Sequence, residues 1–243
     1  MILGLLGFVV SAAGVAISVL PRHFSGQQQQ QIMAWEIGGR WRQMPAGQIF
    51  PGSVGYSLPD TVIQQDSQLR LSAVRVEIAP QSRCATAGSR AAVEVLRQNG
   101  CEAILRATYV DQTMSFVMTV GVAVLPTAGA ASVASADLAG TQLTAKHAAA
   151  GSTAAAAVRT VHFTGAAAGL YDYSPQISAT VPAGPYLVMY AAGYADGRPR
   201  VQLAQDSYSQ AEMASMAEGV ARSVVDGLGA APPLPHCPGG PGC

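Results

Sequence analysis

Charged side chains are scarce in this chain of 243 residues, where Asp, Glu, Lys and Arg together make up 12%. An ordinary soluble domain carries about twice that share. The 14 basic and 14 acidic residues balance, so the formal net charge is zero. The sequence therefore lacks the basic footprint that attracts nucleic acid or an anionic bilayer surface. We expect no nucleic-acid partner.

The usual signatures of catalysis and cofactor binding are also missing. The sequence has no nucleophile elbow, no two-histidine metal helix, no phosphate loop that ends in lysine and no dinucleotide fingerprint. The single lysine, Lys146, has no serine three positions before it. His162, Asp172 and Ser174 supply the residue types of a catalytic triad within one stretch, but such a trio is common by chance. We predict no catalytic residues and no cofactor.

The first twenty residues, MILGLLGFVVSAAGVAISVL, contain no charged side chain. A bilayer-spanning helix needs ~20 apolar residues, so residues 1–20 are predicted to form a transmembrane anchor. A cleaved signal peptide is the alternative, with a small-residue site at Gly14–Ala16 but no basic start. A buried core helix is a third interpretation. Arg22 follows the segment, and the positive-inside rule taken alone would place the remaining chain in the cytoplasm.

Only four cysteines are present, and their arrangement favours the opposite orientation. An even number of cysteines behind an apolar leader is typical of an oxidising compartment outside the cytoplasm. Cys84 and Cys101 flank a predicted helix. They can meet only if that helix is short, with Ser89 as its N-cap, so that the preceding residues run back along it. We predict this disulfide, while free thiols remain an alternative.

The other two cysteines stand at the carboxyl end, in PHCPGGPGC. The turn-forming residues between Cys237 and Cys243 make a local disulfide easy to close. Pairing between this tail and the body of the protein remains open. His236 with these two cysteines fits no zinc-binding spacing, so no metal site is expected.

The sequence divides into four segments. After the anchor, residues 21–68 are predicted to be a linker with a Pro/Gly-rich lead-in, since Gln27–Gln31 form a polar spacer and residues 45–59 contain loop-forming prolines and glycines. Trp35 and Trp41 are expected to pack on the domain edge rather than in the membrane interface. Residues 69–229 form the predicted extracytoplasmic α+β domain, and residues 230–243 are a Pro/Gly/Cys tail.

Within that domain, hydrophobic periodicity predicts the elements. Strands are expected at 74–78, with Val74, Val76 and Ile78 on the buried face, and at 102–110, 113–125, 158–163 and 185–194. Helices are expected at 89–99, at 126–138 and after Ser209, which with Glu212 fits a capping box. In the last helix, methionines in the apolar stripe are interpreted as core filler.

The order strand, helix, strand, strand, helix, strand matches a ferredoxin-like βαββαβ sandwich, followed by an extra strand and a C-terminal helix. We therefore predict an α+β fold with an antiparallel sheet and helices on one face. The loop implied between residues 140 and 165 is unusually long for a compact domain.

The segments GCEAILRATYVD and TVGVAVLP lie within residues 46–139, a region that also contains IFPGSVGY. This region resembles uncharacterised actinobacterial proteins with one amino-terminal membrane segment and an exported domain. An arginine-rich, alanine-rich composition, with 13 arginines to one lysine, is typical of such GC-rich genomes. The resemblance implies a single-pass membrane anchor and export, and supplies no site residues.

Two functions follow as hypotheses. The first is a membrane-anchored protein-interaction or sensor-like module of the cell envelope, which would meet a partner protein through its sheet or the loop at residues 170–175. The second is an envelope enzyme or small-ligand-binding protein with a pocket assembled from distant residues such as Arg106, Asp111 and His162. The sequence alone does not distinguish these two hypotheses.

Overall fold

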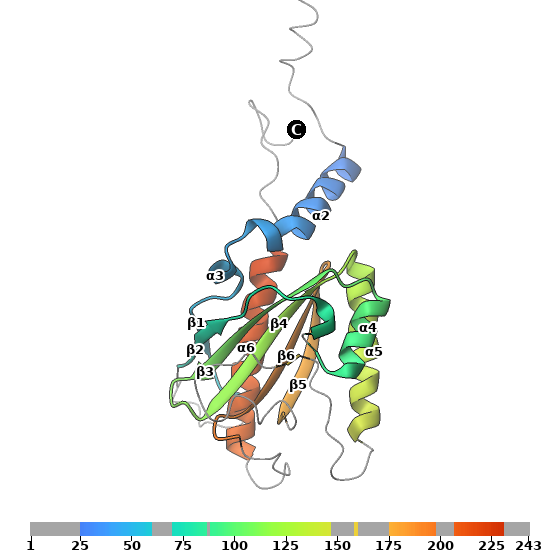
Figure 1. The fold of residues 1–243 in the computed structure, drawn as a ribbon. Coiled ribbons are helices and arrows are strands. Elements are labelled where there is room, and N and C mark those ends of the chain that lie inside the picture. Colours follow the sequence, from blue (N-terminus) through green and yellow to red (C-terminus); the bar gives the residue numbers. More distant parts are fainter. Residues whose placement is uncertain are drawn as a thin grey trace, which may run out of the picture. The chain divides into compact units, whose positions relative to one another are not determined.

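The computed structural model describes residues 25–59, 70–86, 88–146, 158–159, 175–197 and 207–230. The chain divides into two units, and the sheet and its covering helices belong to the unit Ile37–Ala230. The strands in chain order are β1 (Ser53–Tyr56), β2 (Leu71–Ile78), β3 (Ala103–Asp111), β4 (Phe116–Val124), β5 (Ile177–Ala183) and β6 (Tyr186–Tyr194). The helices are α2 (Gly26–Gln43), α3 (Ala46–Ile49), η1 (Cys84–Thr86), α4 (Arg90–Gln98), α5 (Ala128–Lys146) and α6 (Ser207–Gly229) (Figure 1).

The six strands form one sheet in the order β1-β2-β3-β4-β6-β5. Every neighbouring pair is antiparallel. The predicted α+β class and antiparallel sheet are confirmed, but the ferredoxin-like arrangement is wrong. That arrangement needs crossovers between parallel strands, whereas here α4 connects β2 to β3, which are immediate antiparallel neighbours.

Helices cover both faces of the sheet, which corrects the prediction of a single covered face. Successive side chains of β4 point to opposite faces of the sheet, and both faces are buried. Met118 and Val120 pack with α6 in one core, whereas Val117 and Ala123 pack with α4 and α5 in a second core. A strand buried on both faces is apolar throughout, and every residue of β4 is buried. Figure 1 shows α4 and α5 side by side on one side of the sheet.

Helix α6 contributes one apolar face to the first core. The predicted stripe is confirmed, and its members share complete or nearly complete burial: Met213, Met216, Val220, Val224 and Leu228. The methionines are core filler, as predicted. The helix begins at Ser207, two residues before the predicted N-cap Ser209.

Strand β2 differs from its prediction in the face that it buries. Val74 and Val76 are exposed by 41% and 43%, whereas Ala73 is fully buried. The register shifts between Arg75 and Glu77, which marks a β-bulge. A bulge moves the following side chains to the other face, so Ile78 reaches the same core as Ala73 although an odd number of residues separates them.

The loop predicted over residues 45–59 contains the short helix α3 and the strand β1 instead. Ile49 and Phe50 are buried in the first core, together with Trp41 from the end of α2. The compact unit therefore begins at Ile37, within the segment predicted as linker. The glutamines Gln27–Gln31 are helical.

The predicted anchor, residues 1–20, lies outside the described residues. Among the helices that the structure describes, none combines the length and the apolar character needed to cross a bilayer. The strand predicted at 158–163 falls largely outside the described residues as well, and Val158 is not in a strand. Val158 instead covers Gly121 of β4, where an added β-carbon would lie 2.8 Å from its Cγ2 atom.

Candidate binding groove between β1 and α6

Strand β1 and helix α6 approach each other closely because α6 presents small residues to the strand. Ser215, Gly219 and Ser223 recur every fourth position and therefore share one face of the helix. A β-carbon added at Gly219 would stand 3.0 Å from the Cβ atom of Tyr56, so a larger residue there would require the strand or the helix to shift by a few tenths of an ångström. This contact fixes the position of β1 over α6.

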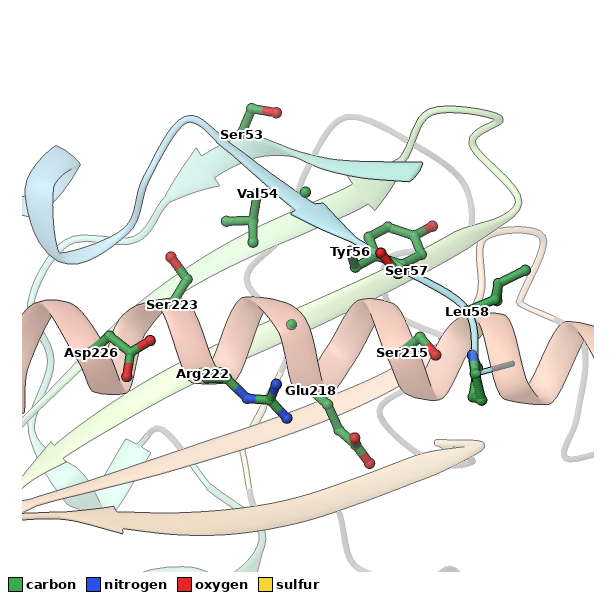
Figure 2. A pocket seen from close by; sticks show the side chains of 13 residues that line it. Ser53, Val54, Tyr56, Ser57, Leu58, Ser215, Glu218, Arg222, Ser223 and Asp226 are labelled. Atoms are coloured by element: carbon green, nitrogen blue, oxygen red, sulfur yellow. The ribbon is translucent and has the colours of Figure 1, made fainter. Parts of the chain in front are cut away.

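A groove of about 730 Å³ runs along β1 and is bounded on its other side by α6. Figure 2 shows the strand lying along the helix, with Ser53 toward the end of α6 that carries Asp226 and Leu58 toward Ser215. The lining combines the backbone of the strand with polar side chains of the helix. Its residues are Ser53, Val54, Gly55, Tyr56, Ser57, Leu58, Pro59, Ser215, Glu218, Gly219, Arg222, Ser223 and Asp226.

The strand that borders this groove is the edge of the sheet. The Arg75 N–H donates to the Gly52 carbonyl at 2.9 Å, and residues in an antiparallel pair alternate between bonding the partner strand and facing away from it. The backbone groups of Ser53 and Gly55 therefore point away from β2. Their side chains are absent or small, which leaves the edge accessible.

Charged side chains on α6 form the outer wall of the groove. Glu218, Arg222 and Asp226 all line it and follow one another at intervals of four residues, so they occupy one flank of the helix. All three are exposed. The wall thus presents negative, positive and negative charge in succession along the strand.

An acid and tyrosine cluster stands at the amino-terminal part of α6. Tyr56 donates a hydrogen bond to the carboxylate of Glu212, and burial together with the charges of Glu212 and Asp111 raises the pKa of the tyrosine. Burial and the nearby Asp111 also raise the pKa of Glu212, while the Tyr56 hydrogen bond opposes that rise. The cluster thus holds two carboxylates close together in a partly desolvated place.

Asp111 has a structural task in this cluster. Its carboxylate is 1% exposed and accepts hydrogen bonds from the backbone N–H groups of Thr113 at 2.9 Å and Phe116 at 2.6 Å. The carboxylate also accepts a hydrogen bond from the Thr113 hydroxyl. Asp111 therefore closes the turn between β3 and β4, which explains why a charged side chain is tolerated in the interior.

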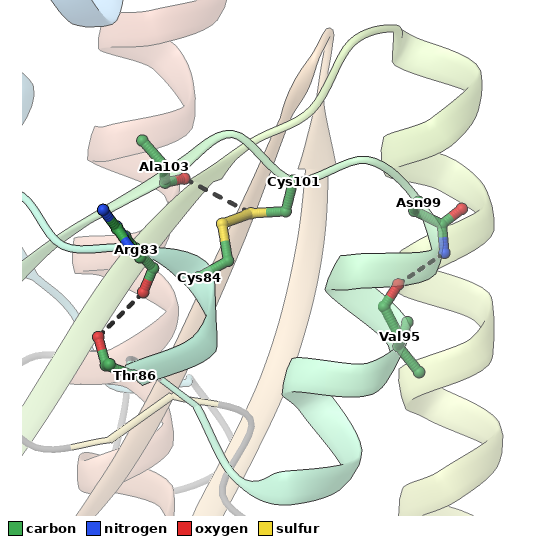
Figure 3. The surroundings of a disulfide bond; sticks show 7 residues. All are labelled: Arg83, Cys84, Thr86, Val95, Asn99, Cys101 and Ala103. Carbon is green, nitrogen blue, oxygen red and sulfur yellow. Dashed lines mark hydrogen bonds between the residues drawn. A yellow bond between two sulfur atoms is a disulfide. The ribbon is translucent and has the colours of Figure 1, made fainter.

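The structure joins Cys84 to Cys101, with Cα atoms 6.3 Å apart. The predicted route is also present, because Ser89 caps α4 by accepting a hydrogen bond from the Ala92 N–H at 3.2 Å. Figure 3 shows the bond connecting the segment before α4 to the segment after it. Gly100 follows the helix with φ of 74°, a left-handed conformation that glycine adopts readily and that turns the chain toward Cys101.

The remaining candidate residues are not brought into one site within the described structure. Arg106 and Asp111 lie on opposite faces of β3, since an odd number of positions separates them. The Arg106 guanidinium donates to the carbonyl of Arg159 at 3.1 Å. His162 lies outside the described residues.

The same holds for several further predictions. The other triad residues, the cysteines of the tail and most of the loop at residues 170–175 are outside the described part of the chain: Asp172, Ser174, His236, Cys237 and Cys243. Those predictions remain predictions. Within the described residues no cluster of His, Cys, Asp and Glu side chains could hold a metal ion.

The groove was not predicted from the sequence, because the prolines and glycines of residues 45–59 indicated a loop where the structure has β1. The available signal was the alternation in SVGYSL, where Val54, Tyr56 and Leu58 are buried and the residues between them are exposed. A period of two indicates a strand even when it is only four residues long. Comparison of the chain with protein families, curated proteins and solved structures finds no match.

Proposed function

We propose that this chain is a membrane-anchored, extracytoplasmic protein-interaction domain of the cell envelope, and that the β1–α6 groove is its contact surface. The apolar residues 1–20 would hold it in the membrane as a single-pass protein. The Cys84–Cys101 disulfide supports a location outside the cytoplasm, because such bonds persist in oxidising compartments.

The observation that carries the interaction role is the accessible edge of β1 beside a groove. Sheet edges are templates for pairing with another chain, and proteins commonly block them with lysine, proline or a bulge. Ser53, Gly55 and Ser57 supply none of these three devices, and the only protection of this edge within the described residues is that β1 has four residues and is followed by Pro59. An edge left open and bordered by a polar wall fits a surface that receives a partner protein.

The location is tested with reporters fused after Cys243. Alkaline phosphatase should be active there, because it requires an oxidising compartment, and green fluorescent protein should stay dark if exported through the general secretion route. A fluorescent fusion without phosphatase activity would reverse the orientation and remove the envelope role.

The contact surface is tested by photo-crosslinking in cells. A photoreactive amino acid at Ser57, in the groove, should give a defined crosslinked protein that mass spectrometry identifies. Val133, exposed by 53% on α5 at the other face of the sheet, is the matched control position. Equal crosslinking from both positions, or none from Ser57, would contradict the assignment of this surface.

A second candidate function, the binding of a small organic cation, is favoured by a different observation. A cleft of about 430 Å³ at the beginning of α6 is lined by the acids Asp196 and Glu212 and by the aromatic rings of Phe116, Tyr194 and Tyr208. Carboxylates and ring faces are the groups that hold ammonium ligands. Titration with choline, followed through tyrosine fluorescence, tests this function; a flat response would exclude a choline-like ligand.

A further inference from the structure

We infer that the β1–α6 groove binds an extended polypeptide segment as a seventh strand, and that it selects a segment whose alternate residues are basic, acidic and basic. This inference rests on the proposed interaction role and specifies the chemistry of the partner. It depends on the register of β1, the spacing along α6 and the charges of the groove wall.

The register provides the backbone half of the site. Ser53 and Gly55 direct their N–H and carbonyl groups away from β2, along the side on which the groove lies. A strand placed there, ~4.8 Å from β1, would complete those hydrogen bonds. The exposed side chains of Ser53 and Ser57 and the bare Cα of Gly55 leave room for its approach.

The spacing along α6 matches the spacing along a strand. Four residues of helix rise about 6 Å, and two residues of strand advance about 6.6 Å, so the two repeats stay in step over three positions. Figure 2 shows β1 lying along α6, so a strand added beside β1 would follow the same course. Every second side chain of that strand would then face one of Glu218, Arg222 and Asp226.

The charges of the wall determine which side chains are favoured. Glu218 and Asp226 attract basic side chains at the two outer positions, and Arg222 attracts an acidic one at the middle position. The pattern reads the same in both directions, so it holds whether the added strand runs parallel or antiparallel to β1. Hydrogen bonds of the backbone would give affinity, and the alternate side chains would give specificity.

The direct test uses synthetic peptides and the full chain in nanodiscs. The probe is a fluorescent nine-residue peptide, blocked at both ends, with Lys, Glu and Lys at its third, fifth and seventh positions and Thr or Val elsewhere. Its matched control has Glu, Lys and Glu at those positions. Fluorescence anisotropy should show at least about tenfold tighter binding of the first peptide at low salt, and the advantage should shrink as salt screens the charges.

A reversal of the wall provides the second arm. The variant E218R/R222E/D226R changes only exposed side chains, so it should fold, which circular dichroism and retention of the disulfide check. It should prefer the Glu-Lys-Glu peptide by a similar factor. An unchanged preference in this variant, or equal binding of both peptides to the natural chain, would overturn the inferred charge selection.

Changes to the backbone hydrogen bonds distinguish strand addition from simple charge attraction. Gly55→Pro removes an N–H that points away from β2, whereas the ladder to β2 is left intact. Peptide binding should fall by about tenfold or more, a loss of the order of one backbone contact to a strand partner. Two N-methylated peptides provide a further test, one methylated at the odd-numbered residues and one at the even-numbered residues. Only one of these two sets of N–H groups would point toward β1, so one methylated peptide should lose binding and the other should retain it. Binding that tolerates all of these changes would refute strand addition.

The outcomes distinguish this inference from the proposed function. Crosslinks from Ser57 without charge-selective peptide binding would support the groove as an interaction surface and contradict the inferred charge-selective strand addition. Charge-selective peptide binding, together with a reporter result that places the carboxyl end in the cytosol, would support strand addition and contradict the envelope location. If the cysteine of a Ser53→Cys or Ser57→Cys variant resists thiol labelling in the folded protein, another part of the protein already covers this edge, and the inference fails.

Discussion

The hydroxyl of Tyr186 on β6 lies between two backbone groups of α2, accepting a hydrogen bond from the Trp41 N–H at 3.3 Å and donating one to the Ile37 carbonyl. Ile37 and Trp41 are four residues apart, the spacing of a helical hydrogen bond. The tyrosine therefore joins the sheet to the helix backbone at that position. Burial raises the pKa of Tyr186, so the hydroxyl stays protonated and remains a donor.

Removing this hydroxyl should loosen the end of α2. Tyr186→Phe preserves the buried ring but leaves the two backbone groups without the hydroxyl. We expect a loss of about 1 to 2 kcal/mol in the free energy of unfolding. Urea denaturation gives that value, and hydrogen exchange at the Trp41 amide should accelerate. Tyr194→Phe, on the same strand, is a control that should leave the Trp41 amide unchanged.

The Cys84–Cys101 disulfide should contribute measurably to stability. It closes a loop with a sequence separation of 17, for which loop-closure entropy predicts about 3 kcal/mol. The double variant C84S/C101S should therefore unfold at lower urea concentration. A reducing agent should lower the midpoint of the natural chain by a similar amount and have a much smaller effect on the double variant, whose remaining cysteines are Cys237 and Cys243. Equal midpoints for both oxidised proteins would contradict a stabilising role.

The sequence was sufficient to predict elements whose signals are local. Ser89 and the apolar stripe of α6 each act within one or two helical turns, and the structure places both as predicted. The disulfide followed from the same local geometry, because the length of α4 decides whether the two cysteines can meet. Local periodicity and capping were therefore sufficient to predict most of the helices and strands, and with them the α+β class.

The topology could not be predicted in the same way because strand pairing depends on distant residues. The bulge between Arg75 and Glu77 reverses the faces of β2, and nothing in VRVEI indicates it. The groove required β1 and α6 to meet although more than 150 positions separate Tyr56 from Gly219. Only the small size of Gly219 hinted that another element would approach there.

The contact between Gly219 and Tyr56 should tolerate no added carbon. Gly219→Ala would bring two β-carbons to 3.0 Å, and both belong to backbone-anchored positions that cannot rotate away. The resulting strain of about 1 to 3 kcal/mol should exceed the gain of up to about 1 kcal/mol that alanine brings to a helix. Gly140→Ala in α5 is the matched control, because its added carbon meets nothing within 4 Å. That variant should be neutral or slightly more stable in thermal unfolding.

Glu212, which lies near Asp111, should make stability depend on pH. The pKa of Glu212 is raised in the folded state, chiefly by burial and then by Asp111, so the folded chain holds this proton more tightly than the unfolded chain. The resulting stabilisation is complete below the unfolded pKa of about 4.3 and is lost as pH rises through the folded pKa. Glu212→Gln retains an acceptor for Tyr56 without the charge.

The Glu212→Gln variant should therefore gain stability relative to the natural chain as pH rises from 4 to 8. We expect a difference below about 1 kcal/mol, because the carboxyl is partly exposed and solvent screens it. Urea midpoints measured across this range provide the test. Tyr56→Phe removes the hydrogen bond that lowers the pKa of Glu212, so the pH-dependent loss should begin at the same pH but extend to higher pH and become larger. Parallel curves for the natural chain and Glu212→Gln at every pH would show that Glu212 does not titrate abnormally.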